Sequence, residues 1–161
     1  MFNKIIVAVD RSDTSQNAFT KAIAFAKLVQ GTIMLVHVLS PMEENYPKPI
    51  FPIDSVYTSL KAEAIKSHFQ QWEELEQEGL TLLRNLTAQA TAEGIPTEFT
   101  QPLGHPGQAI CVWARTWEAD LIIIGRRGRA GLSELFLGSM SNYVLHHAPC
   151  SVLTVQGAIQ P

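Results

Sequence analysis

A glycine-rich segment near the C-terminus carries the residues best suited to binding an anion. It reads GRRGRAGLSELFLGS and fits the pattern G-x2-G-x9-G-[S/T] at Gly125, Gly128, Gly138 and Ser139. Glycines let backbone N–H groups approach phosphate oxygens without a side chain in the way. A helical pattern begins at the end of this segment, and the free N–H groups of a helix N-terminus attract anions. We therefore predict a phosphate-binding loop; the alternative is that these glycines only shape turns.

Polar side chains near this segment offer further contacts. Ser139 and Ser141 each add a hydroxyl donor. Three arginines occur in the segment, and either they reach phosphate oxygens or they form a solvated basic loop; both interpretations stay open. They are Arg126, Arg127 and Arg129.

Asp10 ends the first apolar run of the chain and offers a carboxylate. It can accept hydrogen bonds from a ribose hydroxyl or a base amine. The alternatives are that it caps the first helix or pairs with an arginine of the glycine-rich segment. We favour the ligand role, because Asp13 is positioned to cap that helix, with Gln16 three residues later.

The remaining reactive side chains do not form a recognisable catalytic or metal set. Cys111 and Cys150 are far apart in sequence and are interpreted as buried, reduced thiols. His37 lies in an apolar run and is interpreted as a core histidine with a satisfied hydrogen bond. Trp113 and Trp117 are interpreted as core residues. The motifs of P-loop NTPases, dinucleotide Rossmann sites and nucleophile elbows do not occur, so we predict neither catalytic residues nor a metal site.

The elements that must position these residues alternate between short apolar runs and longer helical periods. Strands are expected at 5–9, 32–39, 96–101, 120–124 and 151–155. Helices are expected from Asp13 to a stop at Gly31, at about 60–93, after Pro106, and at 139–147. Strands separated by helices predict a parallel sheet covered by helices on both faces.

Two segments between these elements stand out. Residues 40–58 hold four prolines among apolar and aromatic residues, which predicts an irregular, functional loop and a candidate lid. The long helix after it should bury one apolar stripe, within which Gly79 marks a close contact or a slight kink. The stripe comprises Phe69, Trp72, Leu75, Gly79, Leu82, Leu83, Leu86 and Ala90.

Length and charge narrow the class of protein. The chain has 161 residues, which suits a single domain spanning 1–161. Its formal net charge is −3, which provides no overall attraction to nucleic acid or to an anionic membrane. No stretch approaches the roughly 20 apolar residues of a membrane span. We expect a cytoplasmic protein without nucleic-acid or membrane partners.

With these motifs in view, the chain resembles the universal stress protein family in its ATP-binding branch. The resemblance covers nearly the whole length. It rests on KIIVAVDRSDTSQNA, MLVHVL, GHPGQAI and, above all, DLIIIGRRGRAGLSELFLGSMSNYVLHHAPCSVLTV. It implies a Rossmann-like α/β fold, related to the adenine nucleotide alpha hydrolases, with one open five-stranded parallel sheet in the order 3-2-1-4-5. Asp10 and Gly125 would then flank the point where the strand order reverses.

The resemblance also implies a set of ligand contacts. The adenosine end would lie at Asp10 and the backbone near Ala8, with Val38 lining the adenine pocket. Gly125 and Gly128 would contact ribose and phosphate. The outer phosphates would be held by Gly138, Ser139, Met140 and Ser141. Many relatives have glycine after the first aspartate, and Arg11 in its place would alter the base pocket.

The function implied is a stress-response or signalling protein whose conformation or association depends on ATP, with at most weak ATPase activity. ADP, AMP and cyclic adenine dinucleotides are not distinguished from ATP, which would bring Mg²⁺ with it. A homodimer through 151–155 is also implied and would cover a sheet edge. The alternatives are a slow ATP hydrolase on the same fold and a dimeric interaction module that needs no nucleotide.

Overall fold

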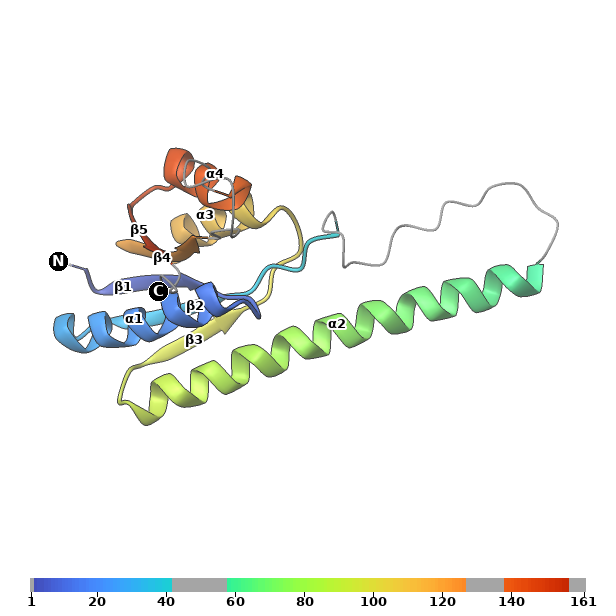
Figure 1. The fold of residues 1–161 in the computed structure, drawn as a ribbon, viewed down its shortest axis with the longest axis horizontal. Helices are drawn as coiled ribbons and strands as arrows, with labels where there is room; N and C mark the ends of the chain where they lie inside the picture. The colour runs from blue at the N-terminus through green and yellow to red at the C-terminus, as the bar shows by residue number, and fades with distance from the viewer. Residues whose placement is uncertain (1, 42–57, 127–137, 157–161) are drawn as a thin grey trace, which may run out of the picture.

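The computed structural model describes residues 2–41, 58–126 and 138–156 (Figure 1). Strands and helices alternate along these residues, as the sequence predicts. In chain order they are β1 (Lys4–Ala8), α1 (Asp13–Val29), β2 (Thr32–Val36), α2 (Thr58–Ala92), β3 (Thr97–Thr100), α3 (Pro106–Thr116), β4 (Leu121–Arg126), α4 (Ser139–His147) and β5 (Ser151–Gln156). The loop expected at 40–58 falls mostly outside the described residues, so its role as a lid stays a prediction.

The strands form one parallel sheet in the order β3-β2-β1-β4-β5. This confirms the predicted α/β fold and the strand order that the family resemblance implies. The order reverses at β1, which pairs with β2 on one side and with β4 on the other. The carboxyl ends of these three strands therefore meet at one edge, where open parallel sheets bind ligands.

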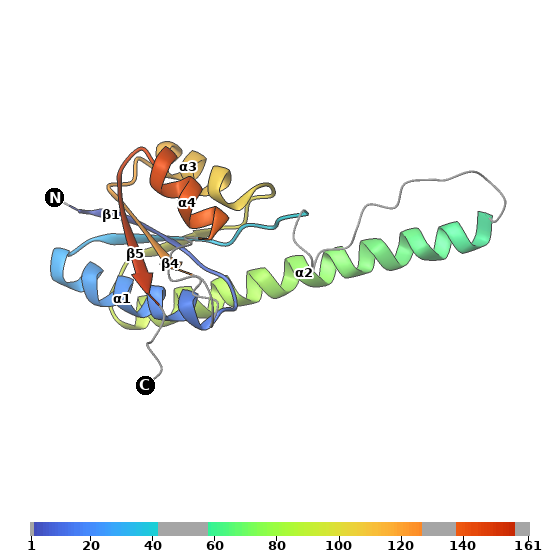
Figure 2. The ribbon, with the colours of Figure 1, turned by 45° about the horizontal axis from the view of Figure 1, so that its top comes forward.

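Side-chain alternation along the strands divides the core into two layers. Ile5 and Val7 of β1 join the layer under α1 and α2, whereas Ile6 and Ala8 join the layer under α3 and α4. The two helix pairs lie on opposite faces of the sheet (Figure 2). Burial on both faces explains why the strands read as continuous apolar runs.

The ends of α1 differ from the expectation. Ser12, rather than Asp13, caps the helix, because its side chain accepts a hydrogen bond from the Ser15 N–H. At the other end Gln30 adopts the left-handed conformation, with φ 54°, in the place expected for Gly31. Gly31 serves packing instead, since a Cβ there would lie 3.0 Å from the Asn3 carbonyl oxygen.

Helix α2 is much longer than the sheet that it covers. Its 35 residues give an axis of about 52 Å at 1.5 Å per residue, whereas the strands have four to six residues. Its C-terminal half packs on the sheet, and its N-terminal half projects beyond the carboxyl edge (Figures 1 and 2). Phe69 is consequently 66% exposed, which corrects the prediction that it lies on the buried stripe.

Gly79 marks the point where α2 meets the end of the sheet. A Cβ at this position would lie 2.5 Å from Gln101 Oε1 and 2.7 Å from His37 Nδ1. The sequence left a close contact and a kink as alternatives, and the structure shows the close contact. Glycine thus lets α2 approach β2 and β3.

Gly79→Ala should therefore lower the free energy of unfolding by about 1–3 kcal/mol through overpacking, although alanine favours an ordinary helix interior by about 1 kcal/mol. Asn85→Ala, on the exposed surface of the same helix, should be neutral or stabilising. Urea unfolding of both variants checks the sign. A Gly79→Ala protein as stable as Asn85→Ala would contradict the close contact.

Candidate functional site

Strands β1 and β4 part at the carboxyl edge of the sheet. Their pairing ends at Val7 and Ile123. β4 remains paired with β5 as far as Arg126, and the Val9 N–H still bonds the Val36 carbonyl of β2 at 2.9 Å. The chain therefore separates here into two groups of strands, each held in place by its outer neighbour. This is the position predicted for the ligand.

One face of this separation is filled by the first turn of α1. A Cβ on Gly125 would lie 2.7 Å from the Thr14 carbonyl oxygen and 3.2 Å from the Ser15 nitrogen. Glycine at 125 is therefore required by a backbone-to-backbone contact within the fold. We predicted Gly125 for its access to phosphate, and the structure adds this packing reason.

Asp10 builds the turn that leads from β1 into α1. Its Oδ1 accepts hydrogen bonds from the Ser12 N–H, at 2.8 Å, and from the Ser12 hydroxyl. Its own N–H donates to Ser15 Oγ at 2.8 Å. Asp10 therefore supports the cap of the first helix, which we weighed as the alternative role, and the argument from an Asp13 cap was wrong. Its ligand role stays a prediction.

The N-terminus of α4 presents its backbone donors without a side-chain cap. Gly138 is the N-cap residue and has no side chain to accept from them. Its carbonyl accepts the first helical bond, from Asn142 at 2.9 Å, so Ser139, Met140 and Ser141 have no partner for their N–H groups within the helix. Ser141 is buried, and its hydroxyl lies 3.5 Å from the Gly125 carbonyl oxygen. The two ends of the glycine-rich segment are thus brought together.

Gly138 differs from Gly125 in what surrounds it. No atom of the described residues lies within 4 Å of a Cβ at 138, and its φ of −55° suits any residue. The fold therefore gives no reason for glycine at this position. A serine would cap the helix better, so glycine leaves the donors and the space in front of them open to an external anion.

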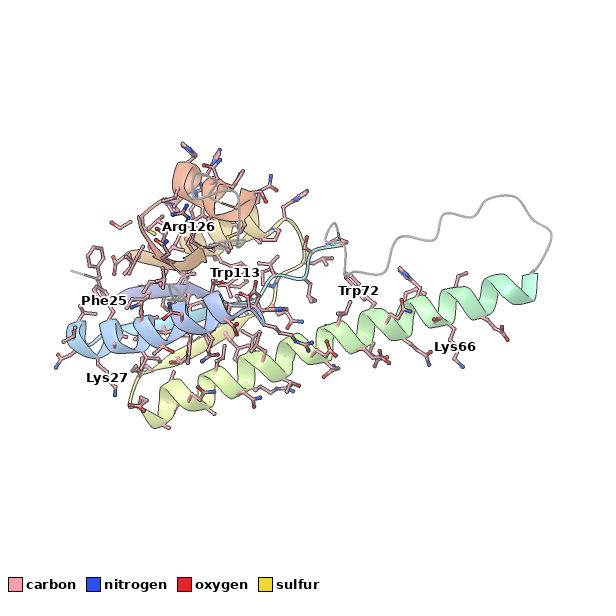
Figure 3. The ribbon with its side chains drawn as sticks, viewed as in Figure 1. Phe25, Lys27, Lys66, Trp72, Trp113 and Arg126 are labelled. Atoms are coloured by element: carbon pink, nitrogen blue, oxygen red, sulfur yellow. The ribbon has the colours of Figure 1, made fainter. Side chains whose placement is uncertain are left out.

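The other predicted contacts lie around the same edge or outside the described residues. Ala8 is the last residue of β1 and is buried, and Val38 is half-buried against the α3 and α4 layer. Arg126 is the half-buried last residue of β4 (Figure 3). The predicted residues Gly128, Arg127 and Arg129 lie outside the described residues.

A polar cluster beside the site was missed by the sequence analysis. His37 follows β2 and faces Gln101, which follows β3. Gln101 is oriented by its amide, which donates to the Glu76 carbonyl of α2 at 3.1 Å. His37 Nδ1 and Gln101 Oε1 are buried, and neither has a hydrogen-bond partner among the described residues. The prediction of a satisfied histidine was therefore wrong.

The same cluster includes the residue that departs from the family pattern. Arg11 pairs with Glu78 of α2, its Nη2 lying 2.7 Å from Oε2, and both side chains are about half exposed. Arg11 therefore ties the turn after β1 to α2. The signal that could have revealed this cluster is the single glycine at 79 in the middle of a long helix, since glycine there indicates close neighbours.

The remaining reactive groups behave as structural residues. Burial raises the pKa of the Cys111 and Cys150 thiols, and both are free cysteines. Trp113 and Trp117 pack against the α3 and α4 layer, as predicted. No group of three or more His, Cys, Asp or Glu side chains within 2–41, 58–126 and 138–156 is arranged to hold a metal ion. Within the same ranges no helix is long and apolar enough to cross a membrane.

The two glycines at the ends of the segment should respond oppositely to substitution. Gly125→Ala should lower the free energy of unfolding by about 1–3 kcal/mol, because its Cβ meets backbone atoms that cannot move aside. Gly138→Ser should leave it unchanged or raise it by up to about 1 kcal/mol through capping. Denaturant unfolding monitored by circular dichroism measures both. Equal losses in the two variants would mean that both glycines serve only the fold.

Acid should weaken the packing around His37. Burial lowers its pKa below 6.5, and Arg11 acts in the same direction, while Asp10 and Gln101 oppose the shift. The unfolded chain therefore binds more protons between the folded pKa and about 6.5, so stability is lost as the pH falls through this window. His37→Gln removes that component. The stability of the wild type relative to this variant should decline from about pH 8 to about pH 5; a constant difference would exclude His37 as the titrating group.

Comparison with known proteins places this geometry in a family. The model of the Universal stress protein family matches residues 1–156. Universal stress protein Sll1388 of Synechocystis sp. is 36% identical over 96% of this chain and 98% of its own length. The structure of MJ0577 from Methanocaldococcus jannaschii superposes with a TM-score of 0.75 at 22% identity and covers 99% of both chains.

Two further solved structures share the fold and hold nucleotides. A universal stress protein in complex with cAMP gives a TM-score of 0.63 at 22% identity, covering 98% of this chain and 99% of that one. The Arabidopsis thaliana family protein At3g01520, with AMP bound, gives 0.62 at 22% identity, covering 97% and 92%. The family model, which spans nearly the whole chain, settles the assignment: this chain belongs to the universal stress protein family.

Proposed function

We propose that this protein binds an adenine nucleotide, with ATP as the preferred form, at the carboxyl edge where β1 and β4 part. The observation that carries the proposal is the uncapped N-terminus of α4. It offers the N–H groups of Ser139, Met140 and Ser141 beside open space at Gly138, an arrangement suited to phosphate oxygens. The AMP and cAMP bound by two structural relatives support an adenine nucleotide.

In this proposal the phosphates lie at the start of α4, and the nucleoside lies toward Ala8, Asp10 and Val38. Gly128 and Arg126 belong to the same predicted contact set. The described residues hold no carboxylate cluster that could bind a metal on its own. Any Mg²⁺ would therefore be held mainly by the phosphates and water, as is usual for this ion.

The nucleotide would act as a signal rather than as a substrate for rapid turnover. No arrangement of nucleophile and base is evident among the described residues of this edge, and the buried His37 faces α2. Nucleotide occupancy would therefore change conformation or association. Sustained turnover that disappears in Ser139→Ala would favour the slow ATP hydrolase instead, and a protein that ignores all adenine nucleotides would favour the interaction module.

A homodimer through β5 forms part of the proposal. Among the described strands, β5 pairs with β4 alone and so leaves its outer edge open. Ser151, Leu153 and Thr154 on this strand are exposed. An open strand edge of this kind favours pairing with a second chain.

Gly138→Val tests the nucleotide site. The branched side chain would enter the open space before the α4 donors, so we expect ATP affinity to fall at least about tenfold, equivalent to about 1.4 kcal/mol, while the fold is kept. Isothermal titration with ATP, ADP and AMP measures the loss and ranks the ligands.

The matched control is Gln108→Val, which places the same side chain on an exposed position in the first turn of α3. It should bind like the wild type. Unchanged affinity in a folded Gly138→Val protein would refute this placement of the phosphates.

A further inference from the structure

The projecting half of α2 carries an apolar stripe that continues the face buried on the sheet. Ile65, Phe69 and Trp72 follow the helical spacing of the residues that pack on the core. Those buried residues are Gly79, Leu83, Leu86 and Ala90. Beyond the sheet, Phe69 is 66% and Ile65 46% exposed, and Trp72 is half-buried. An amphipathic helix gains its stability in proteins mainly by packing its apolar face, so this half of α2 is suited to a partner.

We propose that this partner is the same half of α2 in a second copy of the chain, packed antiparallel. A two-fold pairing uses the same surface twice and therefore must be self-complementary. The stripe meets this condition when Phe69 lies at the two-fold axis. Ile65 then lies opposite Trp72 of the partner helix, and Trp72 opposite the partner's Ile65, so each smaller apolar side chain meets a larger one.

The charges beside the stripe support the same register. Lys66 and Glu73 are seven residues apart and hence lie on the same flank of the helix, with both side chains exposed. Lys66 points away from the side on which Trp72 lies (Figure 3). In an antiparallel pair centred on Phe69, Lys66 of each helix comes level with Glu73 of the other. A parallel pair would instead place like charges together.

The length of the projecting half leads independently to this centre. The projecting half runs from Thr58 to the first contacts with the domain, which are those of Glu76, Glu78 and Gly79. Its midpoint is therefore close to Phe69. In this register the tip of each α2 reaches the level at which the other helix enters its own domain. The two domains then lie at opposite ends of the pair and do not collide.

The contact is distinct from the proposed β5 edge. It is one helix wide and about 30 Å long at 1.5 Å per residue, at the small end of stable interfaces. We therefore expect association that reverses on dilution. The β5 edge and the α2 stripe belong to different parts of the domain (Figure 2), so substitutions in α2 test this interface alone.

Cysteine cross-linking tests the position of the axis. In full-length protein carrying Cys150→Ser, with the buried Cys111 retained, Phe69→Cys should form a disulfide-linked dimer under mild oxidation, because the two copies of residue 69 meet. Gln70→Cys is the matched control, since residue 70 is exposed at the same height on the opposite face. It should remain largely uncross-linked. Equal cross-linking at both positions, or none at 69, would overturn the proposal.

Charge exchange tests the direction of the pair. Lys66→Glu should slow cross-linking at residue 69 several-fold, and adding Glu73→Lys should restore it. Sedimentation of protein without the cysteine changes should show that Phe69→Glu reduces the wild-type mass by one association step, with circular dichroism unchanged. A stripe covered by another part of the same chain would leave that mass unaltered, and this result would also refute the pairing.

Discussion

The contact between Gly125 and the first turn of α1 is the constraint on which the site depends. A hydrogen atom in place of a side chain lets the Thr14 carbonyl and the Ser15 N–H lie directly against β4. Ser15 in turn receives the Asp10 N–H on its hydroxyl and donates its own N–H to Ser12 Oγ. The position of α1, the turn after β1 and the start of the glycine-rich segment are therefore set together. A larger residue at 125 would disturb all three.

This constraint also explains how the fold leaves donors available. At α1 the chain satisfies its own helix N-terminus through Ser12, whose side chain is itself held by Asp10. At α4, on the other side of the order reversal, the N-cap residue is Gly138 and no side chain caps the helix. The same edge therefore contains one closed and one open helix N-terminus. The open one is the site that an anion can stabilise.

The sequence predicts the elements well because their signals are local. Continuous apolar runs mark strands buried on both faces, and the bounds expected for α4 agree with the structure. The glycine pattern locates the site, although it does not reveal that Gly125 also serves packing. The strand order came from the family resemblance, since no local pattern determines which strands pair.

What the sequence could not predict depends on contacts between distant elements. The competition between Ser12 and Asp13 for the cap is decided by the turn that Asp10 builds. The environment of His37 depends on Gln101 and Gly79, which lie on two other elements. Phe69 continues the stripe in sequence but lies beyond the end of the sheet, and only the relative lengths of α2 and the strands show this. Periodicity identifies a face but not what covers it.

Helix α2 connects the edge that carries the site with the surface proposed for self-association. Glu76 and Glu78 contact Gln101 and Arg11, and Gly79 lies against His37. A helix transmits displacement along its axis because its backbone is internally hydrogen-bonded. If nucleotide binding alters the turn that holds Arg11, it changes the orientation of α2 and hence the pairing of its projecting half. Linkage then requires the reverse effect as well: pairing of the helices must change nucleotide affinity by the same factor.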